Sequence, residues 1–326
     1  MNTASSTRID LRLSVHHLQF TLEAQTFVQF GRQAGAQLRG ALWAALEQFA
    51  CTDPRVRTAE HRRHCPMCRL VALETGESAR GANPPRPFVI RPPRGADAGD
   101  ECSFHPGERF TIGVSLFGNA TELFPYICQA IYRAGSIGVG FGRGQFTIHE
   151  IHAVNPISGQ TQPLFEGGRV QAAPTLPLTH DQVLDFTAVL PSDHLNIHFL
   201  TATQLTSEGR VSTKPQFDIL IARLLERCQA MEIHYTEEEV DAARWRSLYL
   251  DLTAQAADVK LVKDDTRWLK VLNGSRRSNS VNSISGLVGQ VRYEGDLTPF
   301  LYWLVWGSVL HVGKNAVKGN GWYEIR

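Results

Sequence analysis

The residues best suited to chemistry lie in the last sixteen positions of the 326-residue chain. Three glycines alternate there with two lysines and follow a histidine: His311, Gly313, Lys314, Lys318, Gly319 and Gly321. Glycine allows positive φ and close backbone approach to a ligand, and clustered NH groups and cations suit a phosphate. We therefore predict an anion-binding loop in which the lysines contact phosphate and the histidine transfers protons. The alternatives are solvated lysines and a histidine that only orients the loop.

Two nucleotide-binding motifs do not fit this chain. Five residues separate Gly307 from Gly313, where a P-loop has four, and Asn315 replaces the Ser or Thr that binds magnesium. The glycine cluster at 138–144 does not match the dinucleotide fingerprint in any register. The sequence therefore argues against a nucleotide cofactor.

The elements that must position these residues fall into two similar halves. In the first half, alternating and helical spacings of apolar residues predict strands at 9–30, 110–116 and 144–154, and helices at 38–49 and 120–134. We expect one further strand within the loop-rich stretch at 51–107. This β-α-β-β-α-β order is the split βαβ, or ferredoxin-like, unit.

The second half repeats the pattern. It predicts strands at 195–202, 256–261, 268–271, 288–293 and 321–325, and helices at 216–231 and 297–310. We predict an α+β protein with two tandem ferredoxin-like (RRM-like) domains. The N-terminal domain spans 1–155 with a cysteine-bearing insertion at about 51–107, a linker region spans 156–190, and the C-terminal domain with its glycine-rich loop spans 191–326.

Composition restricts the class of protein. The chain is 43% hydrophobic and 20% charged, and its length predicts about two domains. We find no long apolar run and no signal peptide, so we expect a cytoplasmic protein without a membrane segment. The net charge is only +1, so any binding to RNA phosphates must come from local basic clusters.

Four cysteines and two histidines gather in the loop-rich region: Cys51, His61, His64, Cys65, Cys68 and Cys102. The pair Cys65 and Cys68 forms a C-x-x-C knuckle, which suits tetrahedral zinc. We predict a structural zinc ion held by the four cysteines, or by three of them with His61 or His64 in place of Cys102. The alternative is a set of reduced, partly buried thiols.

Four groups of residues, in order along the chain, carry a family resemblance. They are Gly35 with Leu38-Arg39-Gly40, Leu116-Phe117-Gly118 with Phe124-Pro125-Tyr126, Gly138-Val139-Gly140 with Arg143-Gly144, and the stretch from Gly286 through Gly313-Lys314 to Tyr323. Together they resemble a CRISPR-associated endoribonuclease of the RAMP superfamily, which processes precursor crRNA. The resemblance spans nearly the whole chain and implies the same two tandem domains.

The resemblance also implies a reaction that needs no metal. A 2′-hydroxyl attacks the adjacent phosphate and leaves a 2′,3′-cyclic phosphate and a 5′-hydroxyl, with a base, a cation and an acid assisting. The family commonly places a histidine on or near the first helix, but the predicted helix at 38–49 has none. The catalytic candidates are therefore His311 and either His16 or His17, which must point to opposite faces of a strand.

The resemblance assigns RNA contacts to the basic, serine-containing segment before Gly286. Lys270, Arg276 and Arg277 are its cations, and Arg39 matches the early motif. A disordered loop and a packing arginine are the alternatives. The expected partners are CRISPR repeat RNA or crRNA and other CRISPR effector subunits.

Three functional classes remain open. The first is the repeat-cleaving endoribonuclease, which we favour. The second is a non-catalytic RAMP subunit that binds and retains crRNA in an effector complex, which the missing helix histidine favours. The third is an interaction module with a zinc knuckle and no RNA role, which the near-neutral charge favours.

Overall fold

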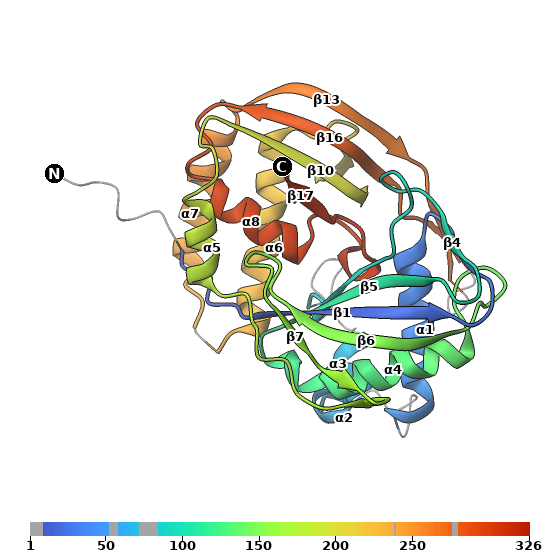
Figure 1. Ribbon diagram of the computed structural model, residues 1–326. Coiled ribbons are helices and arrows are strands. Elements are labelled where there is room, and N and C mark those ends of the chain that lie inside the picture. The colour runs from blue at the N-terminus through green and yellow to red at the C-terminus, as the bar shows by residue number, and fades with distance from the viewer. Residues whose placement is uncertain (1–8, 52–57, 72–83, 238, 276–279) are drawn as a thin grey trace.

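Two antiparallel sheets with helices packed on them organise the chain (Figure 1). The computed structural model describes residues 9–51, 58–71, 84–237, 239–275 and 280–326. Each sheet has the strand order of a ferredoxin-like unit, so the predicted α+β class with two such sheets is confirmed.

The N-terminal sheet has the strand order β3-β5-β1-β6-β7. Its strands are β3 (Phe88–Arg91), β5 (Arg109–Phe117), β1 (Val15–Ala24), β6 (Phe146–Val154) and β7 (Thr161–Pro163). Helices α1 (Ala34–Phe49) and α4 (Phe124–Ile137) cover one face (Figure 1). Leu18, Phe20 and Leu22 of β1 pack in the core beneath these helices. Because strand side chains alternate, His17 lies on the other face, which looks toward the C-terminal half.

The C-terminal sheet has the order β13-β16-β10-β17. Its strands are β13 (Lys260–Leu269), β16 (Gly286–Glu294), β10 (His194–Thr203) and β17 (Tyr323–Ile325), and its helices are α6 (Phe217–Tyr235), α7 (Ala242–Ala256) and α8 (Leu301–Leu310). Nearly every residue of α8 is buried, and Trp303 packs against Trp245 of α7. An aromatic core therefore fixes the helix that leads into the glycine-rich segment.

The smaller elements fill the connections. They are β2 (Val28–Phe30), α2 (Ala59–His64), α3 (Pro66–Val71), β4 (Cys102–Phe104), η1 (Gly118–Leu123), β8 (Phe165–Glu166), β9 (Arg169–Val170), α5 (His180–Thr187), β11 (Thr206–Ser207), β12 (Arg210–Val211), β14 (Leu272–Ser275), β15 (Ser280–Ser283) and η2 (Ala316–Lys318). The region predicted as a linker thus contains β7, β8, β9 and α5, and α5 packs against α8.

One predicted strand is wrong. Residues 256–261 were predicted to be extended, but Ala256 ends helix α7, which begins at the N-cap Asp241. The Asp241 side chain accepts hydrogen bonds from the backbone NH groups of Ala243 and Arg244, and the buried Trp245 and Leu248 have helical spacing. The strand begins only at Lys260 of β13.

One hydrophobic cluster joins the two halves. Val15, Val89 and Phe117 of the N-terminal sheet belong to the same buried cluster as helices α6 and α8. The glycine-rich segment, residues 311–322, runs from α8 to β17 between the halves (Figure 1). Among the described residues, no helix is long and apolar enough to cross a membrane.

Candidate functional site

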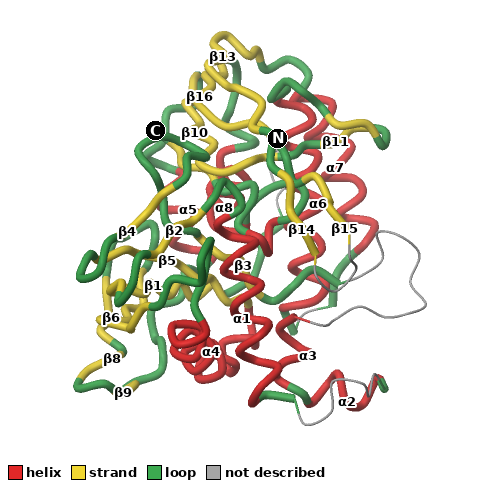
Figure 2. Tube along the Cα trace, turned by 90° about the vertical axis from the view of Figure 1, so that its right-hand side faces the viewer, coloured by secondary structure: helices red, strands yellow, loops and turns green. Residues whose placement is uncertain are grey.

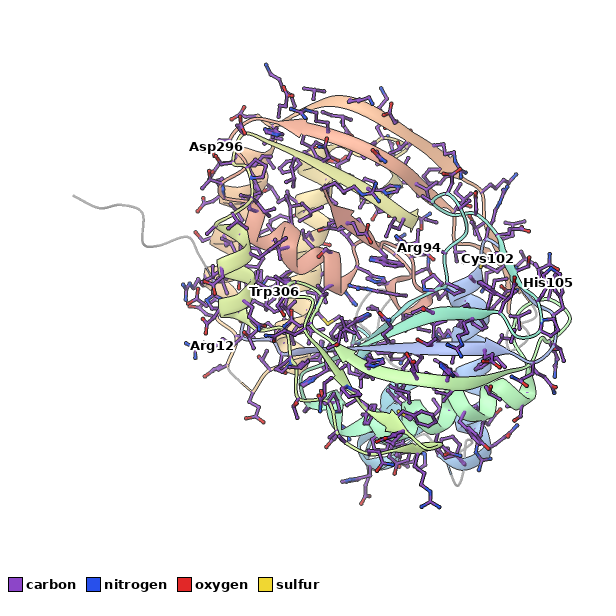
Figure 3. All side chains as sticks on the ribbon, viewed as in Figure 1. Arg12, Arg94, Cys102, His105, Asp296 and Trp306 are labelled. Atoms are coloured by element: carbon purple, nitrogen blue, oxygen red, sulfur yellow. The ribbon has the colours of Figure 1, made fainter. Side chains whose placement is uncertain are left out.

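A cavity of about 190 Å³ opens between the halves, where the N-terminal end of α1 meets β10, the glycine-rich segment and residues 92–100. One histidine and four cations line it, with two acids: Arg32, Arg94, Asp97, Asp100, His198, Lys318 and Arg326. Arg94 lies between the two sheets (Figure 3). The excess of cations suits a phosphate, and the histidine can transfer a proton beside it.

His198 is the titratable group of this cavity with a pKa suited to a base. Burial lowers the pKa of His198 below its ordinary value, and the positive charges of Arg326 and Arg94 lower it further against the opposing effect of nearby acids. Its Nδ1 atom is buried and has no hydrogen-bond partner among the described residues. The imidazole is therefore neutral near pH 7, which a general base requires.

The cations of the cavity are held loosely. Glu324 of β17 pairs with Arg94 at 3.3 Å and with Arg326 at 3.6 Å, and all three side chains are well exposed. Such exposed pairs contribute little to stability, so a phosphate can compete for the arginines.

Burial, with the positive charge of Arg39 on α1, lowers the pKa of Lys318.

The glycines of the glycine-rich segment serve close packing of the chain on itself. A side chain at Gly321 would place its Cβ 1.9 Å from the Val312 oxygen, and one at Gly35 of α1 would lie 2.0 Å from the Lys318 oxygen. Both distances are far inside van der Waals contact. Only glycine therefore allows α1 to rest on this segment.

The predicted NH cradle for an anion needs a correction. Four NH groups of the segment already donate to backbone carbonyls of the protein: Lys314 to Gln204, Lys318 to Asn315, Gly319 to Ala316 and Gly321 to Ala202. These four donors are engaged within the protein, which argues against anion binding through the Gly319 and Gly321 NH groups in this conformation. The cationic side chains that line the cavity are the better candidates for anion binding.

A second cavity of about 380 Å³ adjoins the first through Pro92, Pro93 and Arg94. His17, Arg91 and Trp322 contribute to its wall. His17 Nδ1 lies 3.0 Å from the Ser115 hydroxyl oxygen, and Arg91 donates to the Ser308 carbonyl at 3.3 Å. The guanidinium groups of Arg91 and Arg94 lie 5.2 and 5.5 Å from the Trp322 ring centre. Burial lowers the pKa of Arg91 to about 10.

His311 lies behind this wall, where a substrate does not reach it. Its side chain is 0% exposed, its Nδ1 is 3.2 Å from the Asn320 carbonyl, and its ring stacks on Trp322 with centroids 6.3 Å apart. Burial and the nearby Arg91 and Arg227 hold the pKa of His311 well below its ordinary value. This burial argues against the predicted catalytic role, and the ring contact places His311 against Trp322.

The first-strand histidines separate as strand alternation requires. His17 is buried beside Arg91 and His311, and burial with these charges holds its pKa well below the ordinary value. His16 is half-buried on the other face of β1, and burial lowers its pKa. Only His17 therefore lies on the side of the cavities.

The remaining predicted RNA contacts are scattered. Lys314 is exposed and does not line either cavity, and Lys270 is exposed between β13 and β14. Arg39 lies over the Trp43 ring at 6.0 Å on α1. Arg276 and Arg277 lie outside the described residues.

Sequence reasoning missed His198, Arg32, Arg94 and Arg326. His198 occupies an ordinary position of a predicted strand. Arg32 lies in a loop, Arg94 lies in a proline-rich segment, and Arg326 is the last residue of the sequence. No local spacing joins them. Only the ferredoxin-like pairing of β10 with β17 could have brought His198 near the C-terminal residues.

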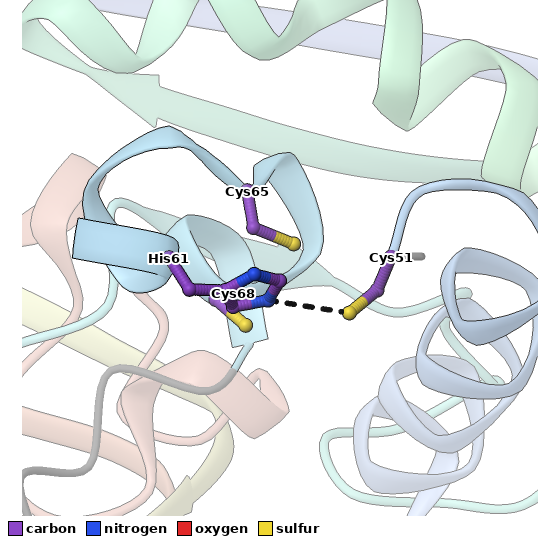
Figure 4. A group of neighbouring side chains, drawn as sticks. All are labelled: Cys51, His61, Cys65 and Cys68. Carbon is purple, nitrogen blue, oxygen red and sulfur yellow. Dashed lines mark hydrogen bonds between the residues drawn. The ribbon is translucent and has the colours of Figure 1, made fainter. Parts of the chain in front are cut away.

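A third group of side chains lies at the far end of α1. Cys51, His61, Cys65 and Cys68 each present one ligand atom, and these atoms all lie within 4.8 Å of one another (Figure 4). This group could hold a structural zinc ion. Cys102, the predicted fourth ligand, is instead on β4, where its Sγ lies 3.9 Å from the Pro93 carbonyl. His61, the predicted alternative, takes that place.

Comparison with known proteins gives two family matches. Residues 13–176 match the AF_1859_N family, described as an N-terminal domain, and residues 197–323 match the CRISPR-associated endoribonuclease Cas6. No curated protein sequence matches the chain.

Solved structures share the fold over nearly the whole chain. A Cas6 product complex matches with a TM-score of 0.54 at 13% identity, over 96% of this chain and 99% of that chain. Thermus thermophilus Cas6 matches at 0.53 and 14% identity, over 96% and 99%. A chain of a partial Cas6-RT-Cas1–Cas2 complex matches at 0.58 and 11% identity, over 97% of this chain and 46% of that one. At these identities the likeness establishes the tandem ferredoxin-like fold.

Proposed function

This chain belongs to the AF_1859_N family through residues 13–176 and carries a Cas6 CRISPR-associated endoribonuclease domain at residues 197–323, and from this premise we propose that it binds CRISPR repeat RNA and cleaves precursor crRNA. One observation carries the proposal of chemistry. The cavity between the halves places a histidine of lowered pKa beside Lys318, Arg94 and Arg326.

We propose that His198 is the general base. Its neutral imidazole accepts the proton of the 2′-hydroxyl, and the 2′-oxygen attacks the adjacent phosphorus. Arg94 and Arg326 then stabilise the charge of the pentacovalent phosphate. No step of this reaction requires a metal ion.

Lys318 is the proposed general acid. The P–O bond to the 5′-oxygen breaks as that oxygen takes a proton from the Lys318 ammonium, leaving a 2′,3′-cyclic phosphate and a 5′-hydroxyl. Burial and the charge of Arg39 lower the pKa of Lys318, which makes its ammonium a stronger acid. The base and the acid thus come from β10 and the glycine-rich segment, which both line one cavity.

RNA binding is proposed to follow the exposed cations of both cavities. Arg32, Arg94 and Arg326 are exposed and can contact a phosphate backbone without reading its sequence. Trp322 is half-buried in the wall of the second cavity and offers an aromatic surface near the same path. Recognition would therefore depend chiefly on RNA shape and unpaired bases.

A second candidate function is retention of crRNA without cleavage. It is favoured by the absence of a histidine from α1 together with the burial of His17 and His311. In that case the cations of the cavity would hold RNA and His198 would have no chemical role.

Cleavage of labelled CRISPR repeat RNA in EDTA tests both candidates. We expect one discrete cut with a 2′,3′-cyclic phosphate end. The matched control is the same RNA with a 2′-deoxy nucleotide at the cut site, which should bind equally and remain intact. Tight binding of the all-ribose RNA without a cut would support retention. Absence of both binding and cutting would overturn the family-based function.

A further inference from the structure

We propose that Cys51, His61, Cys65 and Cys68 bind one zinc ion, which fastens the helices α2 and α3 to the C-terminal end of α1. The four side chains converge from three separate elements (Figure 4). The proposed RNA cleavage needs no metal, so this site would have a purpose of its own.

The geometry is close to that of a loaded site. Tetrahedral zinc binds sulfur at about 2.3 Å and nitrogen at about 2.0 Å, so neighbouring ligand atoms lie roughly 3.8 Å apart. The four ligand atoms here are all within 4.8 Å of one another, and His61 Nε2 is 3.5 Å from Cys51 Sγ. Movements of about 1 Å or less would therefore complete the coordination.

Local structure holds the ligands in this arrangement. His61 and Cys65 lie one helical turn apart, because α2 contains His61 and ends at its C-cap Cys65. The Thr58 side chain caps α2 by accepting a hydrogen bond from the His61 NH at 3.2 Å. Pro66 then begins α3 and brings Cys68 to the same side, which produces a C-x-x-C knuckle.

The chemistry of the donors selects the metal. Three thiols and one imidazole favour zinc over magnesium or calcium, which prefer oxygen ligands. Four protein ligands leave no open position for a substrate, as in structural zinc sites. Cys51, Cys65 and Cys68 are also only 9%, 7% and 6% exposed, which would protect the ion from competing ligands.

The position in the fold explains why a metal would be useful. Helices α2 and α3 each have six residues, too few to be stable as isolated helices. They lie beside the end of α1 that points away from the C-terminal sheet (Figure 2). Cys51 follows α1 directly, so the ion would link this helix to both short ones.

The same position separates the zinc site from the cavity. Gly35 at the start of α1 contacts the glycine-rich segment, and Cys51 follows the helix sixteen positions later. At 1.5 Å per residue, the two ends are about 24 Å apart. The ion would therefore stabilise α1 without taking part in RNA cleavage.

Zinc content and cobalt spectroscopy test the proposal on the full chain. Wild-type protein, purified with reduced thiols from zinc-supplied cells, should contain one zinc ion per chain. Replacement by Co²⁺ should give the visible bands of tetrahedral cobalt and a thiolate-to-cobalt charge-transfer band. Cys68→Ser and His61→Asn should each lose affinity by more than the roughly tenfold effect of an outer-shell change.

Two variants outside the cluster provide matched controls. Cys102→Ser removes a thiol of the same region and His64→Asn removes the next histidine of α2, and both should keep wild-type zinc content. Should Cys68→Ser fail to fold, His61→Cys keeps four soft donors and should retain zinc while strengthening the charge-transfer band. Metal-free wild-type protein, or zinc unchanged in His61→Asn, would overturn the proposal. Because no RNA is present, these outcomes are independent of the proposed cleavage.

Discussion

The two ends of helix α1 carry polar side chains in opposite settings. At its N-terminal end the helix borders an open cavity in which His198, Lys318 and three exposed arginines meet solvent. At its C-terminal end it meets three buried thiols and the partly buried His61. A single helix thus connects the open cavity, where we propose that RNA binds, with the cluster that could hold a structural zinc ion.

This contrast teaches that exposure, not residue type, separates chemical from structural roles here. His198 and His311 both have a lowered pKa and both lie near arginines. His198 lines the open cavity, whereas His311 is fully buried against Trp322. A histidine must reach the reacting atoms to transfer their protons, so of these two we propose the first as the catalytic residue.

The largest expected effect comes from His198→Ala. Cleavage of repeat RNA should fall by about two orders of magnitude or more, because a general base contributes that much, while RNA affinity and thermal stability stay close to wild type. Single-turnover cleavage and the melting temperature measure the two quantities. His194→Ala, on the same strand but outside both cavities, is the control. Cleavage by His198→Ala at the wild-type rate would show that His198 is not the general base, although it lines the open cavity.

His311→Ala should show the reverse pattern. Removing a fully buried ring leaves a cavity beneath Trp322, so we expect a loss of about 2 kcal/mol in the free energy of unfolding. Urea denaturation measures this loss. Cleavage under conditions where the variant is folded should fall by roughly tenfold or less, because the ring acts only by positioning its neighbour. A cleavage defect as large as that of His198→Ala would restore the catalytic assignment of His311.

More of the fold than of the candidate site could be predicted from the sequence. Apolar spacing located most strands and helices, because β1 and β10 alternate buried and partly buried residues and α6 has a clear apolar face. Helix α7 was missed although Asp241 caps it and its buried residues have helical spacing. The start of strand β13 was misplaced because the strand is exposed over most of its length and gives a weak pattern. Local patterns fail where one element is not half-buried.

The candidate site depends on contacts between residues that lie far apart in the sequence. His198 and Arg326 are 128 positions apart and meet only because β10 pairs with β17. Four NH groups of the glycine-rich segment bond to carbonyls of Ala202, of Gln204 and of the segment's own turn, which spacing could not reveal. The cysteine cluster was nearly complete from sequence because three of its ligands are local.

Acidification should destabilise the protein through its buried histidines. The pKa values of His17 and His311 are held well below 6.5, so below that pH the unfolded chain binds protons that the folded chain does not. Stability is therefore complete above about pH 6.5 and falls as the pH decreases. Between pH 6.5 and 5.5 each histidine should cost about 1 kcal/mol. Urea denaturation at both pH values measures this, and His17→Gln should reduce the pH dependence; an unchanged dependence would mean that other groups cause it.

The smallest effect separates the two lysines of the glycine-rich segment. Lys318 lines the open cavity, whereas Lys314 is exposed outside it. If Lys318 contacts a phosphate, Lys318→Ala should weaken binding of uncleavable 2′-deoxy repeat RNA and reduce the slope of log affinity against log salt by about 0.7, the value for one phosphate of a single strand. Lys314→Ala should leave the slope unchanged. Fluorescence anisotropy over a range of salt concentrations measures both variants. The opposite result would move the RNA path out of the cavity and onto the outer side of the segment, where His198 could not reach the scissile phosphate.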